Sequence, residues 1–344
     1  MVFPSETFEQ WSLTTLPGCW VSEAQYRVDW PGISAGNILK EDGVDKKIGF
    51  IGLGEMGKWM AINVLKAGFD LAVYDLRSEA MKILADKGAR PAASPAQVAS
   101  LAEWVFLSLP NTDVVEKVIF GEDGLVDSAK AGSIIIDCGT TSYLPTLEFE
   151  ARLKELGITF VDAPVSGMEA RAREGTLTIM FGGPKSIFDQ VRPVMDTMSN
   201  KVLHMGDVGS GQLTKLVNQL LFNIGCAAIA ELLPMAAKLG LDPEKVTEVI
   251  TTGTGRSFAA EYFAPLALDN VFDKGYPLKH AYKDMISAAE ISANKRIPLP
   301  MVHAAATTYQ MALAEGLGDL GKGAMMKVFE RILGVKFRKR KETI

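Results

Sequence analysis

The chain has 344 residues, of which 48% are hydrophobic and 22% are charged, and its formal net charge is −5. This length fits two domains, and the acidic balance argues against a general nucleic-acid binder, which would present a basic face. Cys19, Cys138 and Cys226 are widely spaced without a C-x-x-C motif, so we expect reduced thiols and a cytoplasmic location. The three histidines lie far apart without neighbouring cysteine or carboxylate motifs, and no metal site is expected.

Residues 1–45 are predicted to be a poorly ordered N-terminal extension. They hold three of the five tryptophans but show no sustained hydrophobic period. They lack the arginine-rich composition of a transit peptide and the apolar core of a signal peptide. One hypothesis is that Val44 marks an alternative start of translation. An intact mass of the natively expressed protein that includes residues 1–43 would contradict it.

Residues 46–57, KKIGFIGLGEMG, predict a strand, a G-x-G-x-x-G turn and the start of a helix. Gly52 permits the tight turn, Gly54 lets the backbone approach a pyrophosphate, and Gly57 lets the helix pack closely on the strand. The helix N-terminus then presents free N–H groups to the anion. The next apolar run ends on Asp75, at the distance expected for a ribose-binding acid. The pattern predicts a dinucleotide site.

Asp75 also bears on which dinucleotide binds. A carboxylate at this position accepts hydrogen bonds from the ribose hydroxyls and repels a 2′-phosphate, which favours NAD. Arg77, two residues further on, keeps NADP open as an alternative, because a guanidinium can pair with a phosphate. The plainer interpretation of Arg77 is a solvated residue near the start of the next helix.

Short β-branched runs alternate with helical patterns from residue 47 to about 163. This alternation predicts an α/β fold with a Rossmann-type, doubly wound, mostly parallel sheet that binds ligands at the carboxyl ends of its strands. The expected strands are 47–52, 70–75, 104–109, 133–139 and 158–164, and helices such as 78–88 and 142–157 lie between them. Two later runs, 176–183 and 201–206, bracket a helical stretch at 184–198 and are expected to extend the same sheet.

Small polar residues follow two of these strands, in the segments 107–113 and 137–142. If the cofactor crosses the switch point of the sheet, both segments should border its nicotinamide half. Plain loops are the alternative, with Pro110 as a strand breaker and Ser142 as the N-cap of the next helix.

From about residue 208 onward strand signals vanish, which predicts an all-α second domain. Its most apolar segment, 220–240, contains Asn223, Glu231 and Pro234, and fits a long buried helix better than a membrane span. Asp242 and Pro243 start the helix that follows. The other helical stretches are 211–240, 264–270, 278–295 and 298–316. The predicted domains are 46–207 and 208–335, followed by a basic tail, 336–344, which is expected to be solvated, with partner contact as a minor alternative.

The candidates for chemistry gather at the join between these domains. Ser166 and Gly167 follow a strand end, where a hydroxyl and backbone N–H groups can hold a carboxylate, although an ordinary turn has the same composition. Lys215 and Asn218 lie three residues apart on a helix and therefore share a face. A lysine that points into an interdomain cleft loses hydration, which suits it to proton transfer. A solvated lysine in the first turn is an equally weighted alternative.

Together these motifs resemble those of the β-hydroxyacid dehydrogenase family, from Lys46 to about Lys336. GFIGLGEMG matches the glycine motif of the family, DAPVSG and GTLTIM match its substrate-binding segment, and GSGQLTKLVNQ matches its catalytic helix. Lys283-Asp284 matches a late Lys-Asp pair that closes over the cofactor. The family includes 3-hydroxyisobutyrate dehydrogenase and 2-hydroxy-3-oxopropionate reductase, also called tartronate semialdehyde reductase.

The resemblance implies a Rossmann-type domain followed by an all-α domain like that of 6-phosphogluconate dehydrogenase, in a homo-oligomer. It implies an oxidoreductase that passes a hydride between NAD(H) and a short 3-hydroxy acid or semialdehyde, with no metal, nucleic acid or membrane involved. Lys215 is the implied general acid/base, and Asn218 would orient it and the substrate. The Asn218-Gln219 pair resembles the 2-hydroxy-3-oxopropionate reductase branch more than the 3-hydroxyisobutyrate dehydrogenase branch.

The resemblance also implies binding residues. Those for the substrate are Ser166, Gly167 and Met168, where Met168 replaces the second glycine of the usual S-G-G and would narrow or reshape the pocket. Those for the cofactor are Gly52, Leu53, Gly54, Glu55, Met56, Gly57, Asp75, Arg77, Leu109, Pro110, Thr140 and Lys283.

Two alternatives stay open. Arg171 and Arg173 are candidates for binding a second acidic group of a substrate, although a surface pair on a loop is the commoner explanation. A non-catalytic dinucleotide-binding module on the same fold is the rival function. The presence of Lys215 and Asn218 argues against it.

Overall fold

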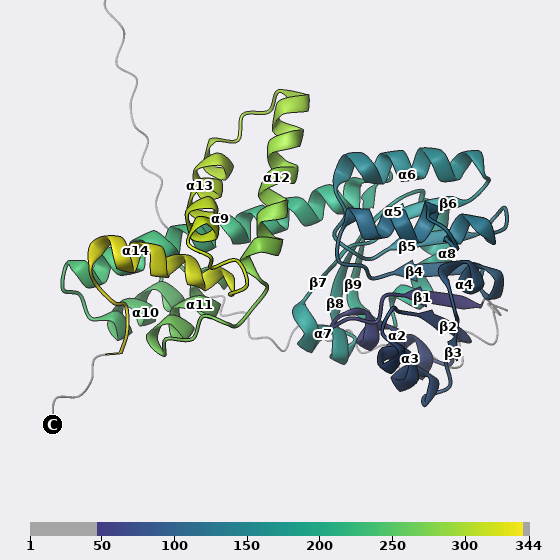
Figure 1. Cartoon of the computed structure of the whole chain (residues 1–344), viewed down its shortest axis with the longest axis horizontal. Coiled ribbons are helices and arrows are strands. Elements are labelled where there is room, and N and C mark those ends of the chain that lie inside the picture. Colours follow the sequence, from purple (N-terminus) through teal and green to yellow (C-terminus); the bar gives the residue numbers. More distant parts are fainter. Residues whose placement is uncertain (1–46, 340–344) are drawn as a thin grey trace, which may run out of the picture. The chain divides into compact units, whose positions relative to one another are not determined.

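The computed structural model describes residues 47–339 (Figure 1). The predicted N-terminal extension 1–45, with the hypothesis of a start at Val44, lies outside these residues. Residues 340–344, the end of the predicted tail, lie outside them as well.

The first half of the described chain forms one sheet in the order β3-β2-β1-β4-β5-β6-β8-β7, with β9 paired to β8. The strands from β3 to β6 are parallel, β8 runs antiparallel to β6, and β9 is parallel to β8. The bounds are β1 Ile48–Ile51, β2 Leu71–Tyr74, β3 Arg90–Pro91, β4 Trp104–Leu107, β5 Ile134–Asp137, β6 Thr159–Asp162, β7 Val165–Ser166, β8 Leu177–Gly182 and β9 Ser199–Gly206. The predicted α/β fold class is therefore confirmed, including the extension of the sheet by the two later runs. The short strands β3 and β7 were not predicted.

The strands β1, β4 and β5 are buried along their whole length, which is typical of a parallel sheet covered by helices on both faces. The connecting helices are α2 Gly57–Lys66, α3 Ser78–Ala85, α4 Pro95–Leu101, α5 Thr112–Phe120, α6 Tyr143–Glu155, α7 Met168–Glu174 and α8 Lys185–Met195, with the short η2 Leu125–Asp127. Asn111 caps α5, since its side chain accepts a hydrogen bond from the Val114 N–H. Ser142 occupies the predicted N-cap position of α6, but its side chain makes no capping hydrogen bond.

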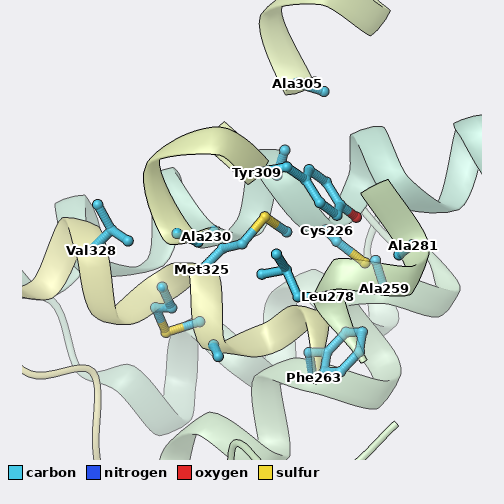
Figure 2. Close-up of a cluster of buried hydrophobic side chains, with 14 of the residues drawn as sticks. Cys226, Ala230, Ala259, Phe263, Leu278, Ala281, Ala305, Tyr309, Met325 and Val328 are labelled. Atoms are coloured by element: carbon cyan, nitrogen blue, oxygen red, sulfur yellow. The ribbon is translucent and has the colours of Figure 1, made fainter. Parts of the chain in front are cut away.

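The second half is helical, as predicted, with α9 Ser210–Lys238, α10 Pro243–Thr252, α11 Phe258–Leu268, α12 Leu278–Lys295, α13 Pro300–Ala314, η3 Lys322–Met325 and α14 Met326–Leu333. Asp242 caps α10 through the Glu244 and Lys245 N–H groups. The helix α11 begins six residues before the predicted stretch at 264, because Ser257 caps it. Figure 2 shows the core of this half, where Cys226, Phe263, Tyr309 and Met325 pack together.

The long helix α9 is only partly buried, which corrects the prediction of a buried helix. One face packs on α11, α13 and α14, while a stripe of apolar residues on another face is exposed. The exposed stripe consists of Val217, Leu221, Leu232, Met235 and Leu239. Length and composition alone would let α9 cross a membrane, but its packing is that of the central helix of a folded domain.

The prediction of a solvated C-terminal tail is wrong for Phe337 and Arg338, whereas Lys336 and Lys339 are exposed. The Phe337 side chain is fully buried, and its backbone N–H donates to Glu330. Arg338 forms an ion pair with the same buried carboxylate at 2.6 Å. Lys339 pairs with Asp269 at 2.7 Å. The basic run therefore neutralises carboxylates of the helical half, and Phe337 closes its core.

Asp162, at the end of β6, connects the sheet to α9. It is fully buried, and its two carboxylate oxygens accept hydrogen bonds from the Gly209 N–H at 2.6 Å and the Gln212 N–H at 2.7 Å. These donors belong to the first turn of α9, whose N–H groups have no partner within the helix. Burial raises the pKa of Asp162 to about 6, although the two backbone hydrogen bonds act against this, and the nearby Asp137 raises it further. The first turn of α9 is thereby anchored to the sheet by a carboxyl group that titrates near neutral pH.

This raised pKa predicts a pH-dependent stability. Because the folded state holds the Asp162 proton more tightly than the unfolded chain does, the stabilisation from that proton is lost as the pH rises from about 4 to about 6. Between pH 4 and pH 7 the unfolding free energy of the wild-type protein should fall by about 2 kcal/mol more than that of Asp162→Asn. Urea unfolding at both pH values measures this, and Asp207→Asn, at an exposed aspartate of the loop between β9 and α9, is the matched control. Parallel pH curves for wild type and Asp162→Asn would contradict the assignment.

Candidate active site

A cavity of about 1170 Å³ lies where the carboxyl ends of the strands meet the helical half. The loops after β1, β2, β4 and β5 line it together with β7, α9, α11, α12 and η3. All the binding and catalytic residues expected from the sequence line this cavity, except Leu53 and Gly57. The structure thus brings together segments that lie more than two hundred residues apart in the chain, from Gly52 to Lys322.

The glycine turn has the geometry that its sequence predicts. Gly52 has a φ of 93°, in the left-handed region, and a Cβ built there would lie 2.3 Å from the Ser108 carbonyl oxygen. A Cβ on Gly57 would lie 1.9 Å from the Gly52 carbonyl oxygen, so only glycine lets α2 start this close to β1. A Cβ on Gly54 would meet nothing nearer than the Arg77 guanidinium at 4.0 Å. The space beside Gly54 and the N-terminus of α2 is therefore open to a pyrophosphate.

Asp75 and Arg77 form an ion pair on the cavity wall, with 3.1 Å between Arg77 Nε and Asp75 Oδ1. The Leu53 N–H also donates to Asp75, at 2.7 Å. Leu53 therefore contributes to the site through its backbone, although it does not line the cavity. Burial alone would raise the pKa of Asp75, but the hydrogen bonds and charge of Arg77 and the Leu53 N–H outweigh it and lower the pKa. Arg77 is exposed and precedes α3, as the plainer interpretation expected, yet its guanidinium is not free.

The loops after β4 and β5 meet at Lys283 of α12. Its Nζ donates to the Pro110 carbonyl oxygen at 3.2 Å and to the Thr140 carbonyl oxygen at 3.1 Å. Burial lowers the pKa of Lys283, and the charges of Asp284 and Asp137 partly offset this. Leu109, Pro110 and Thr140 line the cavity beside this contact. A lysine of the helical half therefore joins the two strand ends where the sequence predicted the nicotinamide half of the cofactor.

The expected carboxylate segment follows β7. Gly167 has a φ of 147°, and Met168 begins α7 with a φ of 60°, in the left-handed region that favours glycine. The Met168 side chain is 46% exposed and lines the cavity, so it shapes the pocket rather than filling the core. The loop expected around Arg171 and Arg173 is the helix α7, which corrects that interpretation. Arg171 lines the cavity. Arg173 does not, and its guanidinium lies over the ring of Trp59.

Lys215 lies on the cavity wall formed by α9 and is 8% exposed, so the alternative of a solvated lysine is wrong. Burial lowers its pKa to about 8. Asp284 raises that pKa again, and the like charges of Lys322 and Lys283 lower it. Asn218, three residues on, lines the same cavity on the same helix face. An amine with a pKa of about 8 therefore lies on the cavity wall beside the strand ends.

Several residues of the site were not singled out from the sequence. Gln212 joins the strand-end loop to α9, because its side chain accepts from the Thr141 N–H and donates to the Gly139 carbonyl oxygen. Asn223, read only as an interruption of an apolar segment, donates to Asp284 at 3.4 Å and accepts from Lys322 at 2.7 Å. The sequence offers one signal for such residues, a polar side chain inside an otherwise apolar helix. Such a side chain is usually buried and hydrogen-bonded.

Two family models match the chain. Residues 47–206 match the NAD binding domain of 6-phosphogluconate dehydrogenase, and residues 209–329 match the model described as NAD-binding of NADP-dependent 3-hydroxyisobutyrate dehydrogenase. The chain is also 38% identical over 290 residues to 2-(hydroxymethyl)glutarate dehydrogenase from Eubacterium barkeri, an alignment that covers 84% of this chain and 96% of that protein. The chain belongs to the β-hydroxyacid dehydrogenase family.

Other relatives agree with this assignment. The 2-hydroxy-3-oxopropionate reductase of Escherichia coli is 33% identical over 284 residues, covering 83% of this chain and 97% of the relative. The crystal structure of 3-hydroxyisobutyrate dehydrogenase from Salmonella typhimurium superimposes with a TM-score of 0.75 and 30% identity, over 83% of this chain and all of that chain. As a member of the β-hydroxyacid dehydrogenase family, the protein is an oxidoreductase that binds NAD(P), as its glycine turn predicted.

Proposed function

We propose that the protein catalyses the NAD-linked interconversion of a short 3-hydroxy acid and its semialdehyde. The observation that carries this proposal is Lys215, an amine with a pKa lowered to about 8, buried in the cavity of an NAD(P)-binding fold. A proton-transfer group works best when its pKa lies near the operating pH. A purely structural lysine would need no such position.

Each residue has a proposed task. The bound nicotinamide supplies hydride transfer, and the other steps fall to side chains and backbone groups. Lys215 gives a proton to the carbonyl oxygen during reduction and takes it from the hydroxyl group during oxidation. Asn218 orients the substrate oxygen toward Lys215. The Ser166 hydroxyl and the backbone N–H groups of Gly167 and Met168 hold the substrate carboxylate. Lys283 keeps the two strand-end loops together beside the reacting carbon.

A substrate panel tests this function directly. The purified full chain is assayed for NADH formation with 3-hydroxyisobutyrate, 2-(hydroxymethyl)glutarate and L-threonate, and for NADH oxidation with tartronate semialdehyde. All four substrates follow the names of relatives of this chain. We expect the enzyme to turn over one of the four substrates with a higher kcat/KM than the other three. We also expect this activity to survive treatment with a chelator. A rate that depends on added zinc would overturn the metal-free mechanism.

The rival proposal is a dinucleotide-binding module without catalysis. It differs from the dehydrogenase in one measurable respect, since it predicts NADH binding without turnover of any member of the panel. Fluorescence titration of NADH, run beside the kinetic screen, separates the two. The buried position of Lys215 supports the enzyme, because a binding module gains nothing from an amine whose charge is destabilised by burial.

NAD is proposed as the preferred cofactor because Asp75 lines the cavity, where its carboxylate would accept hydrogen bonds from the ribose hydroxyls and repel a 2′-phosphate. Replacing Asp75 with alanine removes the proposed ribose acceptor. It also frees the Arg77 guanidinium, which pairs with Asp75 at 3.1 Å in the wild-type protein. We expect the ratio of kcat/KM for NADPH to kcat/KM for NADH to rise by about tenfold or more, as for one charge-assisted hydrogen bond gained or lost. The double variant Asp75→Ala/Arg77→Ala is the control and should lose the gain. A wild-type preference for NADPH would exchange the roles assigned to Asp75 and Arg77.

We also propose a cytoplasmic homo-oligomer of two or four subunits. The exposed stripe of α9 supports this, because a row of large apolar side chains on a monomer surface is typical of a buried interface. Light scattering of the purified chain measures the assembly.

We also propose that the two domains divide between residues 207 and 208, since β9 ends at Gly206 and α9 begins at Ser210.

A further inference from the structure

A second buried lysine faces the cavity, and the proposed reaction does not use it. Lys322 begins η3, is 1% exposed, and lines the cavity. Its Nζ donates to Asn223 Oδ1 at 2.7 Å and lies 3.6 Å from the centre of the Phe222 ring. Asn223 and Phe222 belong to α9, the helix that carries Lys215. An uncompensated ammonium group is costly to bury, so its presence at a cavity wall calls for an anionic neighbour.

The residues around Lys322 do not supply a full anionic partner. Among the described residues that line the cavity, Lys215, Lys283 and Lys322 share one buried carboxylate, that of Asp284. Asp284 already accepts hydrogen bonds from Gln219 and Asn223, both at 3.4 Å. An ammonium group has three N–H donors, and within residues 47–339 Lys322 uses one on Asn223 and directs its charge at one aromatic ring. Donor capacity and positive charge are thus left over on the cavity side.

We propose that Lys322 binds a second carboxylate of the substrate, so that the protein acts on 3-hydroxy acids that are dicarboxylic. This inference rests on the proposed function and narrows its substrate class. The first carboxylate is held at Ser166 and Gly167, on the sheet side of the cavity, and the second reaches Lys322 on the helical side. Asn223, which holds Lys322, lies eight residues beyond Lys215, a rise of about 12 Å along α9. Lys215 and Lys322 nevertheless line the same cavity, so one substrate can contact both.

The wall around Lys322 fits the carbon chain that would join these groups. Phe222, Tyr262, Phe263 and Tyr276 line the cavity near η3 and offer an apolar surface. In such surroundings a hydrogen-bonded ion pair is stronger than in water, which makes the charge of the ligand a strong determinant of specificity. Arg171 is the competing cation, since it also lines the cavity, but it lies on α7 and already donates to Asn200 at 3.3 Å.

The test compares two substrates that differ only at the distal group. The diacid is 2-(hydroxymethyl)glutarate, and its partner is 2-(hydroxymethyl)pentanoate, in which a methyl group replaces the distal carboxylate. For the wild-type holoenzyme we expect kcat/KM to favour the diacid on the order of 10–100-fold, as for one hydrogen bond to a charged group. In Lys322→Met this preference should fall to near one, mainly through a higher KM for the diacid, and Lys322→Arg should restore part of it. Lys327→Met, which removes a lysine stacked on Phe272 away from the cavity, should keep the preference.

Four outcomes would overturn the proposal. A wild-type enzyme that uses the two substrates equally well, or a preference that survives Lys322→Met, removes the subsite. Loss of the preference in Arg171→Met but not in Lys322→Met assigns it to Arg171 instead. A shift of the pH profile by Lys322→Met that is equal for both substrates, with their ratio unchanged, assigns Lys322 to tuning Lys215 alone.

Two further measurements keep the test decisive. If Lys322→Met fails to fold, glutarate and pentanoate are compared as competitive inhibitors of the wild type, and equal inhibition contradicts the subsite. If the wild type turns over no substrate of the panel, the proposed function fails separately. The subsite is then judged by the thermal shift that glutarate and pentanoate produce in the NADH-bound protein, where only a larger shift with glutarate supports it.

Discussion

Replacing Lys215 with alanine should lower kcat by roughly 10²–10⁴-fold, the contribution of a positioned proton-transfer group. NADH binding should stay close to that of the wild type, because the glycine turn and Asp75 lie on loops of the sheet and not on α9. Stopped-flow measurement of the hydride step, with NADH binding followed by fluorescence, separates the two effects. Lys238→Ala, at an exposed lysine of the same helix that donates to the Leu333 carbonyl oxygen, is the matched control.

Two companion variants sharpen this result. Lys215→Arg keeps the positive charge but should not restore the rate, because a guanidinium does not lose its proton in this pH range. Asn218→Ala should cost less than Lys215→Ala, since it removes orientation and leaves the amine in place. A near wild-type kcat for Lys215→Ala would place the acid/base elsewhere, and Lys283 would be the next residue to test.

The lowered pKa of Lys215 also gives the wild-type rate a defined pH dependence. Oxidation of the hydroxy acid needs the neutral amine, so its rate should rise as the pH increases through about 8. Reduction of the semialdehyde needs the ammonium form, so its rate should fall through the same range. The opposite slopes in the two directions identify one group, and both slopes should be absent in Lys215→Ala. Slopes of the same sign in both directions would argue against a shared acid/base.

Gly57→Ala is expected to abolish cofactor binding and to destabilise the sheet domain. In an ordinary helix alanine is more favourable than glycine, so local propensity alone predicts a gain in stability. Here the added Cβ would lie 1.9 Å from the Gly52 carbonyl oxygen and 3.0 Å from the Ser108 Cβ. Either α2 or the turn must move, at a cost of about 1–3 kcal/mol or more. Thermal unfolding and an NADH titration measure the two effects.

Gly54→Ala is the matched variant within the same turn. A Cβ at this position meets only the Arg77 guanidinium, at 4.0 Å, so the free protein should unfold at the wild-type temperature. The methyl group would instead occupy space next to the cofactor pyrophosphate, and NADH affinity should fall by about tenfold or more. Equal loss of stability in Gly54→Ala and Gly57→Ala would show that packing alone explains the glycine spacing of the turn. Unchanged NADH affinity in Gly54→Ala would show that the pyrophosphate does not bind next to this turn.

Much of the fold could be predicted because its signals are local. The strand–turn–helix of residues 46–57 and the acid at Asp75 depend on spacings within thirty residues of the chain. The switch to helix after β9 follows from hydrophobic periodicity, which needs no knowledge of neighbours. The errors were also local. Strand β3 is two residues long, and the helix α7 follows a turn, so neither shows a full period. The charges of the segment 336–339 predict a solvated tail, and the sequence alone does not show that Phe337 enters the core.

The site depended more on tertiary structure. The sequence by itself determined which segments could bind a dinucleotide, since the glycine turn and Asp75 allow little else. It did not decide whether Lys215 is solvated or buried, because both states have the same spacing along α9. Only the folded chain decides this, since α12 and η3 bring Asp284, Lys283 and Lys322 beside Lys215 from more than sixty residues away. The charge and hydration of a side chain depend on what surrounds it in space, and the surroundings of Lys215 and Lys322 come from elements that are distant in sequence.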